Sequence, residues 1–143
     1  MILNDFKTEL IKWRLTKYKA IDFAIGISSL LIYEFIGLPI YRPYIYNNKI
    51  NDFHIADTLG NTFGTLPTLF FLIAILSTET VKGNYLIKLG TFSVIIFEIA
   101  HPLLGKSIDM WDILATALTG FISYAIYNSI FNNKGAQKET TNR

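Results

Sequence analysis

The chain contains no cysteine among its 143 residues, which excludes disulfide bonds, cysteine-ligated zinc and thiol nucleophiles. It also lacks the Ser-x-x-Lys and Gly-x-Ser-x-Gly nucleophile motifs, the P-loop and the glycine-rich dinucleotide fingerprint. No secretory signal peptide is visible, because the first nineteen residues are charged and no small-residue cleavage site follows the first apolar run. We therefore expect no cofactor and no common hydrolase site.

Charge is scarce inside four long apolar runs. The chain is 51% hydrophobic and its mean hydropathy is +0.35. A transmembrane helix needs about 20 predominantly apolar residues, and a soluble bundle would show polar stripes, which are missing from Leu69–Leu76 and Phe92–Ile99. The sequence predicts one all-α membrane domain over residues 20–131. Its four transmembrane helices are expected at Ala20–Ile40, Thr58–Ser77, Tyr85–Leu104 and Met110–Phe131.

The two ends of the chain differ from these runs. In residues 1–19, Leu3, Phe6, Leu10 and Trp13 recur at helical spacing among basic residues, which predicts an interfacial amphipathic helix on anionic lipid. A solvated basic lead-in is the alternative. Residues 132–143 are polar, and we expect a disordered tail.

Basic residues are distributed unevenly along this chain. With four spans, ten of them fall on the side of the termini and three, Arg42, Lys49 and Lys106, fall in the other loops. The positive-inside rule then predicts a multi-pass membrane protein with both termini in the cytoplasm. The topology already accounts for the lysines, so nothing supports binding of nucleic acid.

Two glutamates lie inside apolar runs, Glu34 in the first and Glu98 in the third. An ionisable side chain in hydrocarbon costs at least about 2.5 kcal/mol, so it is rarely kept without a partner or a function. Each glutamate lies six residues before its run ends, about 9 Å deep. We expect both to point into the bundle.

The order of glutamate, proline, basic residue and aspartate occurs twice. It predicts two pseudo-symmetric hairpins, related as parallel repeats about the membrane normal. In each half an aspartate opens the next helix and a polar residue follows one turn later: Asp57 with Asn61, and Asp112 with Thr116. Gly64 continues the first stripe and would allow close approach of another backbone. The alternative role for both aspartates is helix capping, with Asp109-x-x-Asp112 similar to a capping box.

A metal site is a further possibility at the third span. Glu98 and His101 share one helix face, and Glu-x-x-His binds metal in some four-helix bundles. Glu34, Asp57, Asp112 and His54 could add ligands. A di-iron site needs a second such motif, however, and the first half has Gly37 where that histidine would be. We therefore expect no resident metal, and regard Glu98 and His101 as the weak candidates.

The stretch from Glu98 through Gly105-Lys106-Ser107-Ile108-Asp109-Met-Trp-Asp112 to Gly120 resembles the VanZ-like family of small bacterial membrane proteins, named after a teicoplanin-resistance accessory protein. The first half resembles it loosely, through Asp57-x-x-x-Asn61-x-x-Gly64. Lys106, Thr116 and Thr119 depart from the arginine, asparagine and glycine of that pattern. The residues carried over are Glu98, Lys106, Ser107, Asp109, Asp112 and Thr116. The resemblance implies a location in the bacterial inner (cytoplasmic) membrane, association with the cell envelope and a link to antibiotic resistance.

Three kinds of function fit these residues. The favoured one is an outward-facing acidic pocket that binds an envelope lipid, glycan or lipoglycopeptide head group in a protective role. The others are a structural or accessory subunit with protein partners in the membrane, and an acid–base enzyme, with or without metal, acting on an envelope lipid. The candidate pocket residues are Glu34, Asp57, Asn61, Glu98, His101, Lys106, Asp109, Asp112 and Thr116.

Overall fold

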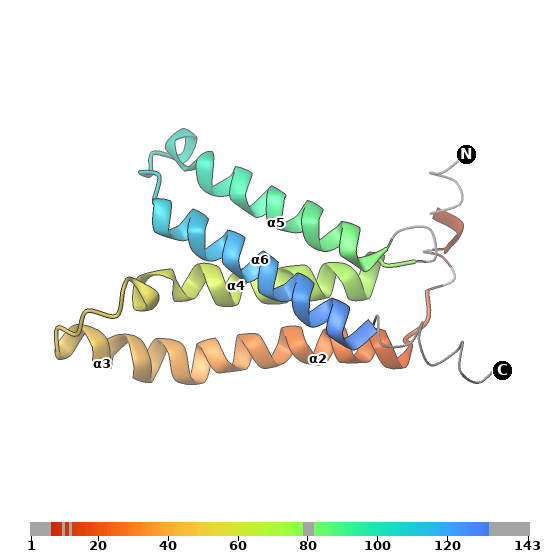
Figure 1. Cartoon of the computed structure of the whole chain (residues 1–143), viewed down its shortest axis with the longest axis horizontal. Coiled ribbons are helices and arrows are strands. Elements are labelled where there is room, and N and C mark those ends of the chain that lie inside the picture. The colour runs from red at the N-terminus through yellow and green to blue at the C-terminus, as the bar shows by residue number, and fades with distance from the viewer. Residues whose placement is uncertain (1–6, 10, 12, 79–81, 132–143) are drawn as a thin grey trace.

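The computed structural model of the chain describes residues 7–9, 11, 13–78 and 82–131 (Figure 1). This part is helical and contains no strand, which confirms the all-α prediction. Its elements are α2 (Lys17–Ile32), the π-helix η1 (Tyr33–Tyr41), α3 (Arg42–Asn47), α4 (Ile55–Leu76), α5 (Gly83–Ile99), the 3₁₀-helix η2 (His101–Leu104) and α6 (Met110–Phe131).

Three of these helices are long and apolar enough to cross a membrane, which indicates a membrane protein. They are Lys17–Asn47, Ile55–Leu76 and Met110–Ile130. The first runs without a break through α2, η1 and α3 and has 31 residues. α5 has only 17 residues, whereas a 30 Å hydrocarbon core needs about 20. The fourth span therefore stays a prediction.

The observed bounds differ from the predicted ones most in the first span, whose continuous helix Lys17–Asn47 runs well beyond the predicted end at Ile40, and in α5, which ends at Ile99 and not at Leu104. Pro102 lacks an N–H, and its ring disfavours α-helical geometry at the preceding residue. The chain therefore continues as the 3₁₀ turn η2. The last helix has the predicted bounds, and α4 begins three residues earlier than predicted.

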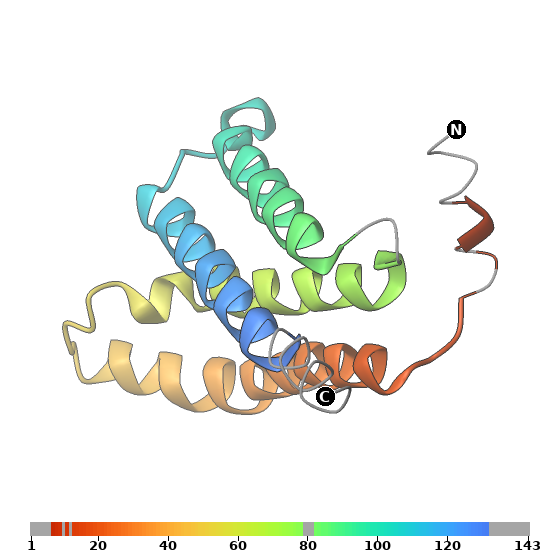
Figure 2. The same ribbon diagram turned by 45° about the vertical axis from the view of Figure 1, so that its right-hand side comes forward.

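α4 packs against α2, α5 and α6, and α6 crosses α4 obliquely so that its end lies beside the beginning of α2 (Figures 1 and 2). The core consists of Leu69, Phe70 and Ile73 of α4 packed against Leu86 and Ile87 of α5. α6 closes on α5 at Gly120, where any side chain would collide with Thr91. Glycine thus allows these two helices to approach closely.

The connections between helices lie at opposite ends of the bundle (Figure 1). The α3–α4 and α5–α6 connections share one end, which we call the loop end. The beginning of α2, the end of α4, the beginning of α5 and the end of α6 share the other, which we call the terminal end. This arrangement places Asp57 and Asp112, which open α4 and α6, at the same end as Glu98.

The predicted amphipathic helix is only partly described. Residues 7–9 and 11 are helical, but Trp13–Thr16 are not, so a single helix over residues 1–19 is wrong. Thr16 is instead the N-cap of α2 and accepts a hydrogen bond from the Lys19 N–H. The Trp13 indole donates to the Ala74 carbonyl at 3.1 Å. Leu3, Phe6, Leu10 and the predicted tail 132–143 lie outside the described residues.

Candidate functional site

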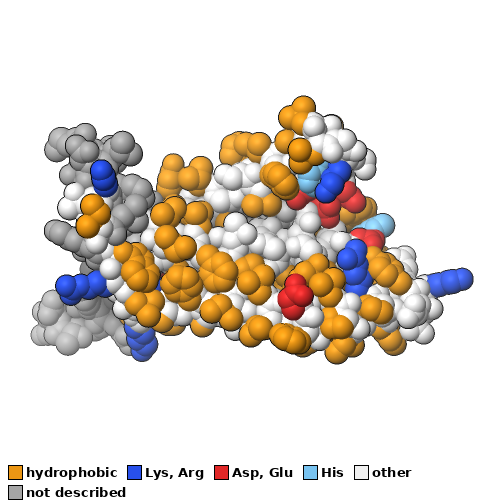
Figure 3. All heavy atoms as spheres, turned by 180° about the vertical axis from the view of Figure 1, so that it is seen from behind, with side chains coloured by type: hydrophobic (Ala, Val, Ile, Leu, Met, Phe, Trp, Pro, Cys, Tyr) orange, Lys and Arg blue, Asp and Glu red, His pale blue; other side chains and the backbone are white. Residues whose placement is uncertain are grey.

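Polar and charged side chains gather at the loop end, while hydrophobic side chains cover the middle of the visible face (Figure 3). The group comes from α3, α4, α6 and the end of α5, together with the loops and the 3₁₀ turn that follow α3 and α5. We call it the loop-end cluster and define it as Tyr46, His54, Asp57, Glu98, His101, Trp111 and Asp112. Two histidine–carboxylate pairs form its framework.

The first pair joins His54 Nδ1 to Asp57 Oδ2 at 3.0 Å. The Tyr46 hydroxyl donates a short hydrogen bond to the other oxygen of Asp57. Arg42 Nε donates to the same hydroxyl at 3.2 Å, and its charge interacts with Asp57. Arg42 therefore supplies a counter-charge to Asp57. The His54 ring also stacks on the Trp111 ring, with centroids 4.8 Å apart, which links α4 to α6.

The second pair joins His101 Nδ1 to Glu98 Oε2 at 3.2 Å. Both side chains are well shielded, and Glu98 is only 7% exposed. The predicted shared face of these two residues is thus present, even though α5 ends between them. Phe97 packs edge-on against the His101 ring. A buried carboxylate is tolerated when it is paired and hydrogen-bonded, so this pair explains how Glu98 is kept inside the bundle.

Asp112 differs from its neighbours, because its half-buried carboxylate accepts no hydrogen bond from the described residues. Its electrostatic surroundings include Asp109, Glu98 and Asp57, which repel it, and only His101 attracts it. The capping roles considered for Asp57 and Asp112 fall to other aspartates. Asp52 accepts from the Ala56 N–H at 2.7 Å, and Asp109 accepts from the Trp111 N–H at 2.8 Å. Asp112 is therefore available to a ligand.

A cavity of about 290 Å³ lies below the cluster, between α4 and α5. Asn61, Gly64, Thr65 and Glu98 are among its lining residues. Two of the candidate pocket residues, Asn61 and Glu98, thus line the same cavity. A Cβ added at Gly64 would meet nothing within 4 Å, so the expected close approach of another backbone at Gly64 is wrong. The missing side chain leaves open space instead.

Glu34 is exposed and does not belong to the cluster. Its predicted inward orientation is wrong, because the neighbouring Tyr33 occupies the inward position. The Tyr33 ring stacks on Phe63 of α4 with centroids 6.2 Å apart. The π-helix begins at Tyr33, and its wider turn changes which residues face α4. Glu34 and Glu98 therefore have different surroundings, and the pseudo-symmetric repeat stays a prediction.

The remaining candidate residues are placed as follows. Lys106 is exposed and makes no ion pair within the part of the chain described. Asp109 is exposed and caps α6. Thr116 is fully buried one turn below Asp112, as the spacing predicts, but its hydroxyl makes no hydrogen bond to the described residues.

Metal binding has no support in this arrangement. Among the described residues, no three histidine, aspartate or glutamate side chains come together in a way that could hold an ion. Each histidine faces one carboxylate, and Glu34 is remote from both pairs.

Sequence reasoning left out Tyr46 and Trp111 as site residues. Tyr46 gives no signal in the sequence, because its contact with Asp57 depends on how α4 returns against α3 after the loop that joins them. Trp111 stands directly before Asp112, and an aromatic residue beside an acidic one at a membrane boundary could have indicated it.

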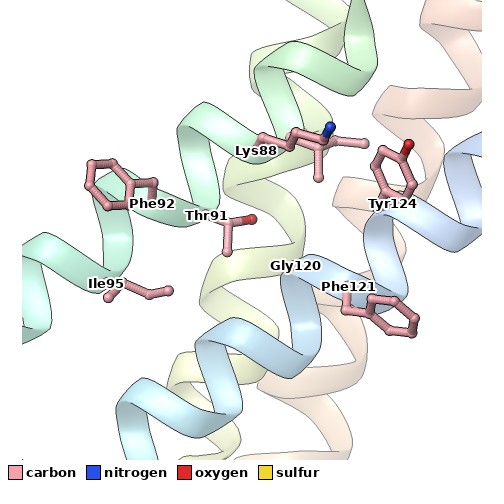
Figure 4. Close-up of a pocket in the computed structure, with 8 residues that line it drawn as sticks. Lys88, Thr91, Phe92, Ile95, Gly120, Phe121 and Tyr124 are labelled. Atoms are coloured by element: carbon pink, nitrogen blue, oxygen red, sulfur yellow. The ribbon is translucent and has the colours of Figure 1, made fainter.

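A groove of about 470 Å³ between α5 and α6 lies away from these carboxylates (Figure 4). Its walls are mostly apolar and include Phe92, Ile95 and Phe121. Lys88 and Tyr124 lie together at one end, with the Lys88 amine 5.4 Å from the Tyr124 ring centroid. This cation–π contact satisfies a charge that would otherwise lie alone on an apolar face.

Comparisons with known proteins give no relative: no protein family, curated protein or solved structure matches this chain.

Proposed function

We propose that this protein is a multi-pass protein of the bacterial inner membrane whose loop-end cluster faces outward and binds an amine-bearing head group of an envelope lipid or glycan. The supporting observation is the Asp112 carboxylate, which has three acidic neighbours and no hydrogen-bond donor among the described residues. An ammonium group would supply both the missing charge and the missing donors. Hydrogen bonds to ionised groups are about twice as strong as neutral ones.

The surroundings of Asp112 suit such a ligand. Trp111 is exposed, and an indole face attracts ammonium groups. A second hollow of about 310 Å³ at the same end is lined by Tyr46, Lys49, Asp52 and Asp57, among others. The lysine of this hollow could bind the phosphate of the same head group, and its tyrosine and carboxylates could bind the hydroxyls. The polar loop end and the apolar helices would place this ligand at the membrane boundary.

The proposal predicts a clear order of ligands. Purified protein in detergent is titrated with short-chain phosphatidylethanolamine, phosphatidylcholine and phosphatidylglycerol, and binding is followed by tryptophan fluorescence. The lipid with a primary amine should bind best and the anionic lipid least, because only the first donates N–H bonds to Asp112. Glucosamine measured against glucose tests the glycan source in the same way. Equal binding of phosphatidylglycerol and phosphatidylethanolamine would contradict the proposal.

Matched variants locate the site. Asp112→Asn removes the charge while keeping the shape, and should weaken amine binding about tenfold or more, since a hydrogen bond to a charged group contributes about 1.5–3 kcal/mol. Glu34→Gln makes the same chemical change outside the cluster and should leave binding unchanged. Amine binding that survives Asp112→Asn would rule out this site.

One observation favours a second candidate function, that of a subunit in a membrane complex. Glu34 is an exposed carboxylate between the exposed side chains of Phe35 and Ile36. Facing lipid, such a carboxylate is costly, and a basic residue of a partner helix would relieve that cost. Cross-linking in membranes, with benzoylphenylalanine at Phe35, tests this candidate. Only adducts that Glu34→Gln abolishes would support it.

A further inference from the structure

A stripe of polar residues runs along the buried face of α6. Asp112, Thr116, Thr119, Ser123 and Tyr127 follow one another at steps of three or four residues and so share one helix face. Thr116 and Ser123 are fully buried and Thr119 is 2% exposed. At 1.5 Å per residue the stripe covers about 22 Å of a core roughly 30 Å thick. We call it the α6 stripe.

At the terminal end the stripe reaches a second buried carboxylate, Asp22 of α2. Asp22 is 2% exposed, and its Oδ1 has no hydrogen-bond partner among the described residues. Its charge interacts with Tyr127 of α6 and with Lys19 of α2. The α6 stripe therefore joins two carboxylate groups at opposite ends of the bundle: Asp22 at the terminal end, and Glu98 with Asp112 at the loop end.

Several polar atoms in this stripe and on the neighbouring helices α2 and α4 also lack hydrogen-bond partners within the described residues. They are the hydroxyls of Ser29, Thr65 and Thr116 and the Asn61 amide nitrogen. Ser29 lies two turns above Asp22 on the same face of α2. Helix-packing hydroxyls are expected to be hydrogen-bonded. Orphaned polar atoms in a polar space are instead the places where buried water binds.

Space for water is present over part of this route. The 290 Å³ cavity below the cluster extends from Glu98 to Thr65 and Thr68, and a water molecule occupies about 30 Å³ in the liquid. Ionisable groups linked by hydroxyls and water inside a membrane bundle form proton relays.

We propose that the α6 stripe and the polar atoms beside it conduct protons through the bundle, between Asp22 at one end and the Glu98–Asp112 group at the other. A proton taken up by one carboxylate passes along water and hydroxyl groups to the other and is released there. No bond to carbon changes and no redox partner is needed. The gradient drives the direction, and another ion must compensate the charge. This proposal does not depend on what the loop-end cluster binds.

The test uses the full chain in liposomes of phosphatidylcholine and phosphatidylglycerol that enclose a pH-sensitive dye. A potassium gradient with valinomycin drives proton uptake, and the initial rate of acidification is measured. The protein should raise this rate above that of protein-free liposomes, and Asp22→Asn should return it to the protein-free level. An unmodified chain that gives only the protein-free rate overturns the proposal, as does a folded Asp22→Asn variant that conducts as well as the unmodified chain.

A second set of variants covers the case in which Asp22→Asn fails to fold. Thr116→Val keeps the shape but removes the hydroxyl and should slow conduction, whereas Thr116→Ser keeps the hydroxyl and should restore it. Ser123 and Ser93 give a matched pair, since each donates to the carbonyl four residues earlier, at 2.8 and 2.9 Å, but only Ser123 is buried. Ser123→Ala should slow conduction and Ser93→Ala should not. Equal rates in all four variants would show that the stripe serves packing only.

Discussion

Asp112→Asn should make the folded protein more stable while it weakens ligand binding. In the native structure Asp112 is repelled by Asp109, Glu98 and Asp57 and attracted only by His101. The substitution removes these charge interactions and keeps the shape of the side chain. It breaks no hydrogen bond, because the carboxylate accepts none from the described residues. Stability and binding should therefore change in opposite directions.

The size of the effect follows from the surroundings of Asp112. Two unit charges 4 Å apart interact by about 1 kcal/mol in water and about 4 kcal/mol near a protein surface. Asp112 is half-buried at a loop end, so we take the value in water, about 1 kcal/mol, for each pair of charges. Three repulsions against one attraction leave two repulsions uncompensated, so we expect a gain of up to about 2 kcal/mol. For a chain of this size that corresponds to an increase in Tm of about 4–8 °C.

Thermal unfolding in detergent, followed by tryptophan fluorescence at low salt, measures this gain. Repeating the scan at high salt should shrink it, because salt screens exposed charges. A lower Tm for Asp112→Asn would refute the reasoning, since it would show that the carboxylate stabilises the fold and is not held ready for a ligand.

Two further predictions concern capping and topology. Asp109→Ala should be about 1 kcal/mol less stable than Asp109→Asn in chemical unfolding, because both variants remove the repulsion between Asp109 and Asp112 but only asparagine keeps an acceptor for the Trp111 N–H. Cysteine at Asn48, at the loop end, should react with an impermeant maleimide in intact cells, while cysteine at Lys82, at the terminal end, should not; the reverse pattern would place the cluster in the cytoplasm.

The helices could be predicted from the sequence because long apolar runs leave few alternatives. The bounds of α6 agree with prediction, and Pro102, which ends α5 early, was visible beforehand. The orientation of Glu34 could not be predicted. A regular α-helical turn was assumed there, whereas the chain adopts a π-helix from Tyr33 to Tyr41, and one added residue per turn changes which side chains face α4.

The site was predicted only in part, since spacing identifies residues on one helix face but not their partners across helices. Glu98 with His101 was found from i, i+3 spacing. The roles of Asp57 and Asp112 stayed open because an aspartate that opens a helix can itself cap it, and the structure assigns capping to Asp52 and Asp109 instead. Asp22 was overlooked, because it lies close to the predicted start of the first span, where an acidic residue is usually solvated.

The carboxylates at the loop end differ in whether they already have hydrogen-bond partners, and this difference distinguishes those that stabilise the fold from the one that is available to a ligand. Asp52, Asp57, Glu98 and Asp109 all have partners within the described residues. A ligand that displaced any of them would have to break a hydrogen bond or a histidine pair, and part of its binding energy would be lost in doing so. Asp112 offers its carboxylate without that loss. Selectivity for an amine should therefore depend on Asp112, while changes at the paired carboxylates should act mainly through the stability of the fold.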